Sequence, residues 1–372
     1  MKIALVHDYI KEFGGAERVL KMLSEMYPEA PIYTAFRVRG STADKEFKGK
    51  KIIEGWLAPL LKIGKLYSPL RFLTPLVWGS FDLSEYDLVI TSCSWYITRG
   101  FKVGKNTKVV AYCHTPPRWL YGYETSVGFT KYLPVKIYSA IVGHFMRLYD
   151  YKTAQLINNW IANSKNVQAR IEKFYGKEST VIYPPIDVEE IISKTKGAKK
   201  EGYFLMVSRL VGAKGLEEVA SAFKKLPYKL KIVGEAAGYS DVLQKLKKLS
   251  GGNIELTGRL GETSLYQTFA HAVGFITLAR DEDFGMTPVE AQAAGTPVIA
   301  YNGGGFKESV VDGVTGILIN GTDEKTIMEA IKRFEKIKWN ISTIIKNAKK
   351  FNKERFKIEF SGYIEKTIWR EK

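Results

Sequence analysis

The sequence predicts an α/β fold with two domains in tandem, each built on a parallel sheet. Its 372 residues exceed what a single hydrophobic core usually supports, so two domains of about 150 to 200 residues are expected. Short apolar runs rich in β-branched residues alternate with longer amphipathic runs, which is the pattern of parallel strands joined by crossover helices. Near the middle, Pro184 and Pro185 favour a stiff, extended connection between domains.

The first half of the chain contains six expected strands. The opening run is broken by His7 and Asp8, so it is too short for the apolar region of a signal peptide and is predicted as a strand. The later runs have the same β-branched character and are separated by stretches long enough for helices. The strands are expected at residues 2–9, 31–36, 86–93, 108–115, 156–164 and 179–185.

The second half repeats this pattern, with strands expected at residues 203–208, 230–235, 253–258, 273–279, 297–302 and 316–320. The boundary is placed in the segment 183–190, because its two prolines end a strand. We therefore expect a first domain at 1–183, a second at 184–351, and a C-terminal helix at 352–372 that packs back on the first domain. Open α/β sheets bind ligands beyond the carboxyl ends of their strands, so substrates are expected in a cleft between the two domains.

Composition limits the classes of partner and compartment. A formal charge of +17 concentrates phosphates, nucleic acid or anionic lipid near the protein without choosing among them. The two cysteines, Cys93 and Cys113, lie in apolar runs without zinc-site spacing, which favours a reducing cytoplasm. No window offers about 20 continuous apolar residues, so no membrane-spanning segment is expected.

The loop at 279–290 carries a cluster of acids with two incompatible interpretations. Asp281 and Asp283 form an Asp-x-Asp pair that could chelate a divalent cation. Glu282 and Glu290 instead form a Glu-x7-Glu pair that could hold the sugar and ribose of a nucleotide sugar directly. Asp-x-Asp is a common chance match, and a solvated loop carboxylate is the ordinary alternative for Glu282.

A helix is expected to begin within this loop. Thr287 is a good N-cap, Pro288 suits the first helical position, and Glu290 stands where a capping-box partner would stand. Gly295 is expected to end the helix. The amides of the first turn, with Gly285 allowing close approach, form a ready phosphate site. The simplest alternative for Glu290 is a purely structural capping role.

Fixed positive charge is expected at the same strand ends, since a diphosphate near these acids would otherwise be repelled. Arg209 follows the first strand of the second half, and Lys214 precedes a helix expected near Leu216. Arginine offers a fork of donors to phosphate and lysine a compact charge. The alternative for both is a solvated surface charge.

The segments "SRLVGAKG" and "EDFGMTPVEAQAAGTPVIAYNGGGFKESVVDGVTG" closely resemble the carboxyl-terminal half of the retaining glycosyltransferases of family 4, which have the two-Rossmann-domain GT-B architecture. The segments "VHDYIKEFGGAERVL", "YCHTPPRWLY" and "IANSKNVQARIEKFYG" resemble the amino-terminal half of that family. The resemblance covers nearly the whole chain, and several motifs in the same order make it more specific than any one alone.

The resemblance implies a role for each motif. Arg209 and Lys214 would bind the donor diphosphate and Glu290 the ribose hydroxyls, while Glu282 would hold the transferred hexose. His114 would face the donor sugar. The remaining implied donor contacts are Gly14 and Gly15, the backbone of Gly258, Arg259 and Leu260 near the nucleobase, and the segment Phe284, Gly285, Met286 and Thr287; Arg118 and Trp119 are implied, more weakly, as acceptor contacts.

Ordinary structural alternatives stand beside these roles. A histidine at a strand end is often bonded only to backbone, and two glycines such as Gly14 and Gly15 can simply form a βα turn. Arg118 beside Trp119 equally suits a surface arginine next to a packed indole.

The resemblance further implies direct sugar recognition without a metal, since Arg209, Lys214 and helix amides would stabilise the leaving diphosphate. Retention of anomeric configuration is implied in the same way. The motif "YCHTPPRWLY" looks most like members that transfer mannose from GDP-mannose, with UDP-linked hexoses as the main alternative. Rival hypotheses are a sugar-nucleotide epimerase of similar fold and a non-catalytic polyanion binder; the latter is disfavoured because no nucleic-acid-binding module is recognisable.

The segment 56–81 suggests contact with a membrane. It carries Lys62, Lys65 and Arg71 without any acid among its aromatic and aliphatic residues. Cations buried in a core are unfavourable unless paired, whereas an interfacial position suits them, with Trp56 and Trp78 at the head-group level. We expect peripheral docking on an anionic cytoplasmic leaflet and a glycan or lipid-linked acceptor, with a helix pair packed on the first domain as the alternative.

Overall fold

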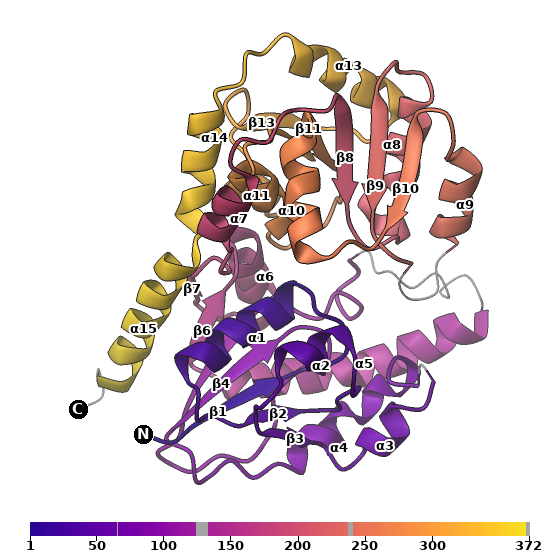
Figure 1. Cartoon of the computed structure of the whole chain (residues 1–372). Helices are drawn as coiled ribbons and strands as arrows, with labels where there is room; N and C mark the ends of the chain where they lie inside the picture. Colours follow the sequence, from indigo (N-terminus) through magenta and orange to yellow (C-terminus); the bar gives the residue numbers. More distant parts are fainter. Residues whose placement is uncertain (65, 124–132, 237–240, 370–372) are drawn as a thin grey trace. The chain divides into compact units, whose positions relative to one another are not determined.

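The computed structural model describes residues 1–64, 66–123, 133–236 and 241–369. It divides into two compact units (Figure 1). Unit 1 contains Met1–Tyr123, Leu133–Pro185 and the chain from Glu354 onward, and unit 2 contains Ile186–Lys353. The chain passes from unit 1 to unit 2 directly after Pro184 and Pro185, so the change of unit coincides with the stiffest dipeptide in the sequence.

Unit 1 is built on a parallel sheet with the strand order β3-β2-β1-β4-β5-β6-β7 in the described part of the chain. Its strands are β1 (Ile3–His7), β2 (Ile32–Thr34), β3 (Ile52–Glu54), β4 (Leu88–Cys93), β5 (Lys108–Cys113), β6 (Asn159–Ala162) and β7 (Thr180–Val181). Its helices are α1 (Gly15–Met26), α2 (Thr42–Glu46), α3 (Ala58–Leu61), η1 (Pro69–Leu73), α4 (Thr74–Gly79), α5 (Leu133–Gln155), α6 (Lys165–Tyr175) and α15 (Lys353–Trp369).

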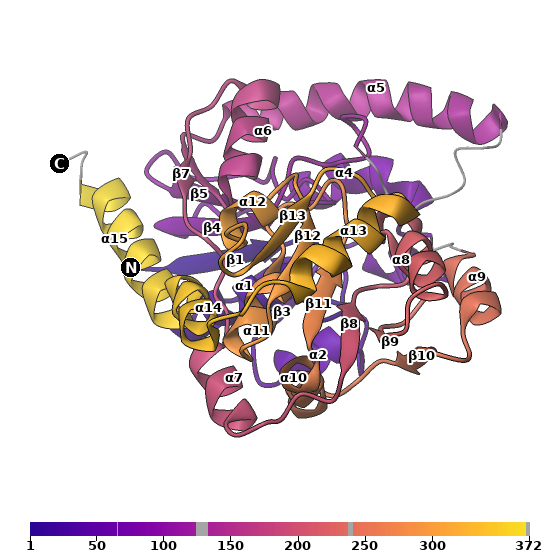
Figure 2. The same cartoon turned by 90° about the horizontal axis from the view of Figure 1, so that it is seen from above.

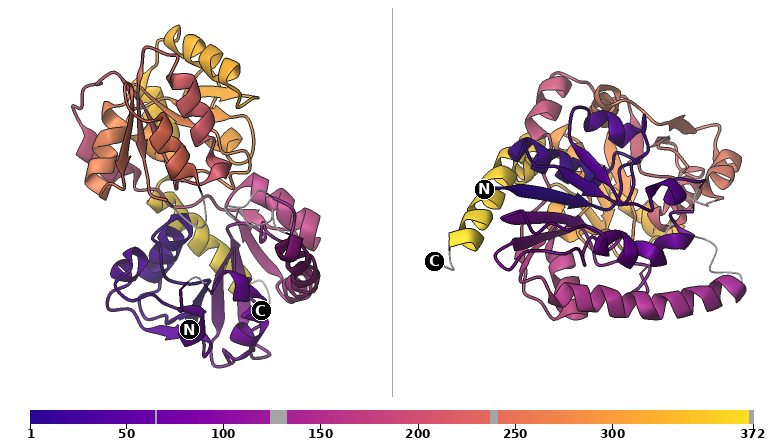
Figure 3. Two further views of the ribbon diagram at one scale, coloured as in Figure 1. Left: turned by 90° about the vertical axis from the view of Figure 1, so that its right-hand side faces the viewer. Right: turned by 90° about the horizontal axis from the view of Figure 1, so that it is seen from below.

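Both faces of this sheet are covered, which explains why its strands read as continuous apolar runs. Leu5 and Ile90 belong to one buried cluster, and the alternate residues Val6 and Val89 belong to another. The C-terminal helix α15 contributes Phe356 to the first of these clusters, although it follows the whole of unit 2 in sequence. Figure 3 shows α5 along the outside of the unit.

Unit 2 repeats the design with the strand order β10-β9-β8-β11-β12-β13 among the described residues. Its strands are β8 (Tyr203–Val207), β9 (Lys229–Val233), β10 (Ile254–Gly258), β11 (Gly274–Thr277), β12 (Val298–Tyr301) and β13 (Gly316–Ile319). Its helices are α7 (Val188–Thr195), η3 (Gly212–Lys214), α8 (Leu216–Phe223), α9 (Val242–Leu249), α10 (Glu262–His271), α11 (Met286–Ala293), α12 (Phe306–Ser309), α13 (Glu324–Glu335), α14 (Ile341–Ala348) and η4 (Lys349–Phe351).

The predicted α/β class with two parallel sheets is confirmed, and each of the twelve predicted runs contains a strand. Strand β3 was not predicted. It is three residues long, directly follows a lysine-rich stretch and lies at the edge of its sheet. A run this short and half-exposed carries too little periodicity to be distinguished from a loop.

The segment 56–81 differs from its predicted membrane-facing arrangement at two residues. Trp78 is fully buried in the core of unit 1, where its Nε1 donates to the carbonyl of Tyr96 at 2.8 Å, so its placement at the head-group level was wrong. Arg71 packs against two indole rings of the same unit. Trp56 is 62% exposed, and Lys62 pairs with Glu54 at 2.7 Å. Lys65 lies outside the described residues.

Candidate active site

Unit 2 has its topological switch point between β8 and β11, neighbouring strands whose connections leave in opposite directions. Ligands of open parallel sheets bind at such a point, beyond the carboxyl ends of the strands. Arg209 and Lys214 follow β8, and Glu282 follows β11. Three of the predicted residues therefore lie at the carboxyl ends of these two central strands.

Lys214 and Glu282 form an ion pair across this switch point. The distance from Lys214 Nζ to Glu282 Oε2 is 2.6 Å, and the two side chains are 20% and 22% exposed. The pair depends on Gly215, which has a φ of +69° and whose Cβ, if present, would lie 2.7 Å from Cβ of Leu278. Only glycine allows this close approach without strain, so the helical turn η3 places its lysine against the loop that follows β11.

Arg209 lies at the open end of β8 with its side chain exposed. In the described part of the chain it has no carboxylate within ion-pair distance. It is thus a cation available for an anionic ligand at the same strand end that carries Lys214.

The loop from Asp281 to Gly285 is held by packing of backbone against backbone. A Cβ on Gly304 would lie 2.3 Å from the carbonyl oxygen of Glu282, and one on Gly305 would lie 2.3 Å from Cα of Phe284. Gly305 N also donates to the Glu282 carbonyl at 2.9 Å. The glycine-rich turn after β12 therefore fixes the loop that carries Glu282.

Helix α11 begins two residues earlier than the capping pattern predicts. It starts at Met286, and its N-cap is Gly285 with a φ of +83°, so the prediction of Thr287 as N-cap and Glu290 as capping-box partner was wrong. A left-handed N-cap is accessible to glycine, which overrides the side-chain capping preference of threonine. Glu290 lies in the second turn and is 2% exposed, so it is not the capping-box partner of Thr287.

The other predicted donor contacts of unit 2 lie at the carboxyl end of β10. Gly258, with a φ of +73°, ends β10. Arg259 lies 4.0 Å from Glu235 at the surface, and Leu260 packs against the core. Among the described residues, no group of three His, Cys, Asp or Glu side chains is arranged to hold a metal ion.

In unit 1, His114 follows β5 directly and is 8% exposed. Its Nε2 lies 2.8 Å from Ser92 Oγ, while its backbone carbonyl accepts from Asn163 Nδ2 at 3.0 Å. Burial, assisted by the neighbouring His7, lowers the pKa of His114 to about 3. The ring is therefore neutral at ordinary pH and can only exchange hydrogen bonds, not carry charge.

His114 is one end of a polar chain that sequence reasoning missed. Ser92 Oγ lies 3.0 Å from Nδ1 of His7, whose Nε2 lies 3.5 Å from Glu17 Oε1. If Glu17 accepts from His7, then Ser92 donates to His7 and accepts from His114 Nε2, which leaves His114 Nδ1 as an acceptor. The available signal was that His7, like His114, lies near the carboxyl end of a predicted strand.

Gly14 and Gly15 lie where α1 begins, with Gly14 as its N-cap. The amide of Gly14 donates to Glu17 Oε2 at 2.9 Å, which ties the start of the helix to the polar chain. Trp119 Nε1 donates to the carbonyl of Trp95 at 3.2 Å, and Arg118 beside it is half-buried. All of these residues belong to unit 1.

Comparison with known proteins gives the family. A model described as "Glycosyltransferase Family 4" matches residues 13–190, and one described as "Glycosyl transferases group 1" matches residues 187–351. The chain belongs to the family 4 glycosyltransferases of GT-B fold. Together the two matches cover residues 13–351.

Individual relatives are distant. An uncharacterized glycosyltransferase of Methanocaldococcus jannaschii is 27% identical over 194 residues, which cover 52% of this chain and 54% of the relative. The alpha-1,3/1,6-mannosyltransferase ALG2 of Dictyostelium discoideum is 24% identical over 289 residues, 65% of each protein. The chain thus spans only about half to two thirds of these relatives. The crystal structure of Anabaena HepE in complex with UDP-glucose superimposes with a TM-score of 0.68 at 18% identity, covering 98% of this chain and all of that one.

Proposed function

We propose that this family 4 member transfers a hexose from a nucleoside-diphosphate sugar to a glycan or lipid-linked acceptor, with retention of configuration. The observation that carries the proposal is the Lys214–Glu282 pair at the switch point of unit 2. It places a cation and a carboxylate 2.6 Å apart beside the start of α11, where a diphosphate and a sugar could replace their mutual contact.

In this proposal Arg209 and Lys214 bind the donor diphosphate and stabilise it as it leaves. The first-turn amides of α11, from Gly285 to Thr287, add donors to the phosphate and the hexose. Glu282 then accepts from hexose hydroxyls and Glu290 from the ribose. Because two fixed cations and a helix start supply the positive charge, the reaction should proceed without a divalent metal.

In unit 1, His114 is the residue that we assign to the reacting sugar. A neutral His114 whose Nε2 is bonded to Ser92 offers Nδ1 as an acceptor to a sugar hydroxyl. Glu17 and His7 fix that tautomer through Ser92, in the way that a carboxylate orients a catalytic imidazole elsewhere. Gly14 and Gly15 are assigned to the same donor, and Arg118 and Trp119 to the acceptor.

The donor is best proposed as GDP-mannose, since the relative ALG2 is named a mannosyltransferase. The Anabaena structure contains UDP-glucose, so a UDP-hexose is the second candidate, with the base read at Gly258, Arg259 and Leu260. A thermal-shift screen against GDP, UDP, ADP and dTDP sugars separates them, because the true donor raises the melting temperature by linkage. No shift with any of the four would contradict the proposal.

A sugar-nucleotide epimerase remains the rival from another enzyme class. It would turn over the nucleotide sugar without any second substrate. If turnover requires an added glycan or lipid-linked acceptor, the transferase function is supported. If the nucleotide sugar is isomerised without an acceptor, the protein is an epimerase instead.

We further propose that unit 1 docks peripherally on the anionic cytoplasmic leaflet, with α5 as its main contact (Figure 2). Leu133, Ile137, Ile141, Phe145 and Leu148 are each at least 46% exposed on this helix. The only acid between Leu133 and Gln155 is Asp150, which is buried, so the exposed charges of the helix are basic. Exposed apolar and basic residues on one helix suit a head-group interface. None of the described helices combines the length and apolarity needed to cross a bilayer.

Co-sedimentation with phosphatidylglycerol and phosphatidylcholine vesicles tests this docking. Changing Ile137, Ile141 and Phe145 to serine should reduce binding to the anionic vesicles at least severalfold. Ile358→Ser on α15, which removes a side chain that is 72% exposed in the same unit, is the matched control and should bind as the wild type does. Equal binding of all three folded proteins would remove the membrane role.

A further inference from the structure

The turn that follows β4, from Ser94 to Thr98, is held in a strained conformation. Ile97 has a φ of +52°, in the left-handed region that β-branched residues rarely adopt. Among the hydrogen bonds that hold the turn, Trp95 N donates to Asp8 Oδ2 at 2.7 Å, Trp78 Nε1 to the Tyr96 carbonyl at 2.8 Å, and Thr91 Oγ1 to the Thr98 carbonyl at 2.7 Å. Backbone strain of this kind persists only where the surroundings impose it, and it gathers at binding sites.

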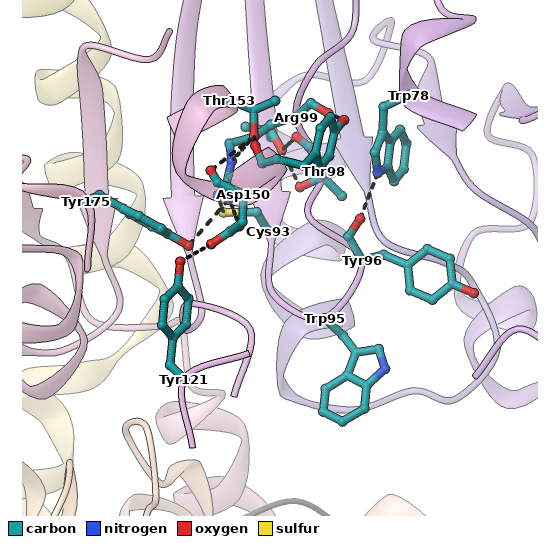
Figure 4. A network of polar contacts seen from close by, with 12 residues as sticks. Trp78, Cys93, Trp95, Tyr96, Thr98, Arg99, Tyr121, Asp150, Thr153 and Tyr175 are labelled. Atoms are coloured by element: carbon teal, nitrogen blue, oxygen red, sulfur yellow. Dashed lines mark hydrogen bonds and ion pairs between the residues drawn. The ribbon is translucent and has the colours of Figure 1, made fainter. Parts of the chain in front are cut away.

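The far end of the turn is anchored in the core by Arg99. Its guanidinium forms a buried ion pair with Asp150 of α5, and Asp150 also accepts from Tyr121 Oη at 2.6 Å. Tyr149 Oη donates to the Arg99 carbonyl at 2.6 Å. Figure 4 shows this network, with the indole of Trp95 on the side of the turn away from Arg99. The network thus fixes the turn that presents Trp95.

Arg71 packs against this indole. Its guanidinium carbon lies 4.9 Å from the ring centroid of Trp95 and 4.7 Å from that of Trp119, within the range of cation–π attraction. Ser68 holds it in place, with its carbonyl and hydroxyl each 2.7 Å from guanidinium nitrogens. A guanidinium fixed between two rings in this way keeps the remaining edge of its fork directed and ready for an anion.

The charge of Arg71 is not balanced by any carboxylate in the described part of the chain. It is half-buried, and burial lowers its pKa from the ordinary value of arginine. Lys11 lies in the same aromatic surroundings, with Nζ 3.0 Å from Tyr67 Oη and 4.3 Å from its ring centroid. A cation partly removed from water without a counter-ion is unfavourable, so an anionic ligand would stabilise this arrangement.

Asp8 provides a second unsatisfied group at these strand ends. Its Oδ2 accepts from Ser94 and Trp95, both at 2.7 Å, whereas its buried Oδ1 lacks a hydrogen-bond partner among the described residues. A buried oxygen without a partner costs free energy unless a ligand or water satisfies it. A hydroxyl group of a bound sugar would do so.

We infer that Arg71, flanked by Trp95 and Trp119, binds the phosphate or diphosphate group of a phosphorylated acceptor. This inference rests on the proposed transferase function and names the class of its acceptor. Arg71 lies in η1, which follows β3, whereas Asp8, Trp95 and Trp119 lie in the loops that follow β1, β4 and β5. The polar chain of His7, Ser92 and His114 lies at the carboxyl ends of the same three strands. The anion would therefore lie close to the polar chain assigned to the reacting sugar, within one unit. Arginine suits phosphate because its forked donors bind two oxygens at once.

The direct test is calorimetric titration of the full chain with inorganic pyrophosphate. A background with both Lys214→Gln and Arg209→Gln removes the two competing cations of unit 2. In that background Arg71→Gln should weaken pyrophosphate binding about tenfold or more, while Arg71→Lys should recover part of the affinity because it keeps the charge. The matched control is Arg39→Gln, which removes an exposed arginine of the same unit. Equal affinity in the Arg71→Gln and Arg39→Gln proteins would overturn the inference.

Arg71→Lys also guards against misfolding, since a folded lysine variant with reduced affinity reports the lost fork rather than a lost fold. Two further probes distinguish a soluble phosphorylated acceptor from a lipid-linked one. They are glucose 1-phosphate in solution and phosphatidylcholine vesicles containing a polyprenyl phosphate. If binding of either probe is weakened by Arg71→Gln, the subsite is supported. If Arg71→Gln weakens the binding of neither probe, the inference is overturned. Nucleotide-sugar binding by the wild type is measured separately, so its absence would contradict the proposed donor while leaving the result at Arg71 intact.

Discussion

The pKa of His114 leads to a quantitative prediction for stability in acid. Burial and the neighbouring His7 lower this pKa from 6.5 to about 3 in the folded chain. Between these two values the unfolded chain binds a proton that the folded chain does not, so stability falls as the pH falls through this window. At pH 5 the linkage relation gives a loss of about 2 kcal/mol relative to neutral pH.

The assay is urea unfolding followed by circular dichroism at pH 7 and pH 5. The His114→Gln variant has no proton to bind, so its loss of stability between the two values should be about 2 kcal/mol smaller than that of the wild type. His144→Gln is the control, because His144 is exposed on α5 and belongs to the same unit. If His114→Gln and the wild type lose the same stability on acidification, His114 is not held as a neutral imidazole in the folded chain.

Three further predictions concern unit 2. Glu282→Gln should abolish transfer with donor affinity kept within about tenfold, whereas Glu290→Gln should mainly weaken donor binding; steady-state kinetics separate the two, and wild-type turnover in both would exclude this site. Activity should survive EDTA, and its loss on chelation with recovery in magnesium or manganese would restore the metal interpretation of the acidic loop. Gly215→Ala should lower the free energy of unfolding by more than about 1 kcal/mol, because its Cβ would meet Leu278 in addition to the cost of a left-handed alanine; Gly252→Ala, also left-handed but with open space around it, should be milder, and equal effects would refute the packing argument.

The strands could be predicted because each is an apolar run of low ambiguity. Buried parallel strands are apolar on both faces, so runs such as 88–93 are conspicuous in the sequence. The same reasoning fails at β3, whose three residues are half-buried and follow a lysine-rich stretch. It also fails at α11, where Gly285 takes the N-cap position from Thr287 because the glycine-rich turn after β12 fixes the loop before it.

Among the site residues, those in recognisable motifs could be predicted, whereas contacts between distant segments could not. Arg209, Lys214 and Glu282 could be predicted because each lies in a recognisable motif between a strand and the following helix. The pairing of Lys214 with Glu282 could not be predicted, because the two residues are 68 positions apart in sequence and the order of the strands brings them together.

The chain from Glu17 to His114 was missed for the same reason. His7, Ser92 and His114 become neighbours only when β1, β4 and β5 pair in register. The surroundings of Arg71 could not be predicted from the sequence either. Its positive charge suggested a membrane contact, but the fold turns it towards two indoles whose positions depend on separate loops.

We propose that unit 2 binds the diphosphate of a nucleotide sugar through Lys214. Calorimetric titration of the best nucleotide sugar from the thermal-shift screen, with the wild type, Lys214→Gln and the exposed-lysine control Lys247→Gln, tests it most directly. Lys214→Gln should weaken binding about tenfold or more, while the control should bind as the wild type does. Binding that is equally tight in all three proteins would contradict it.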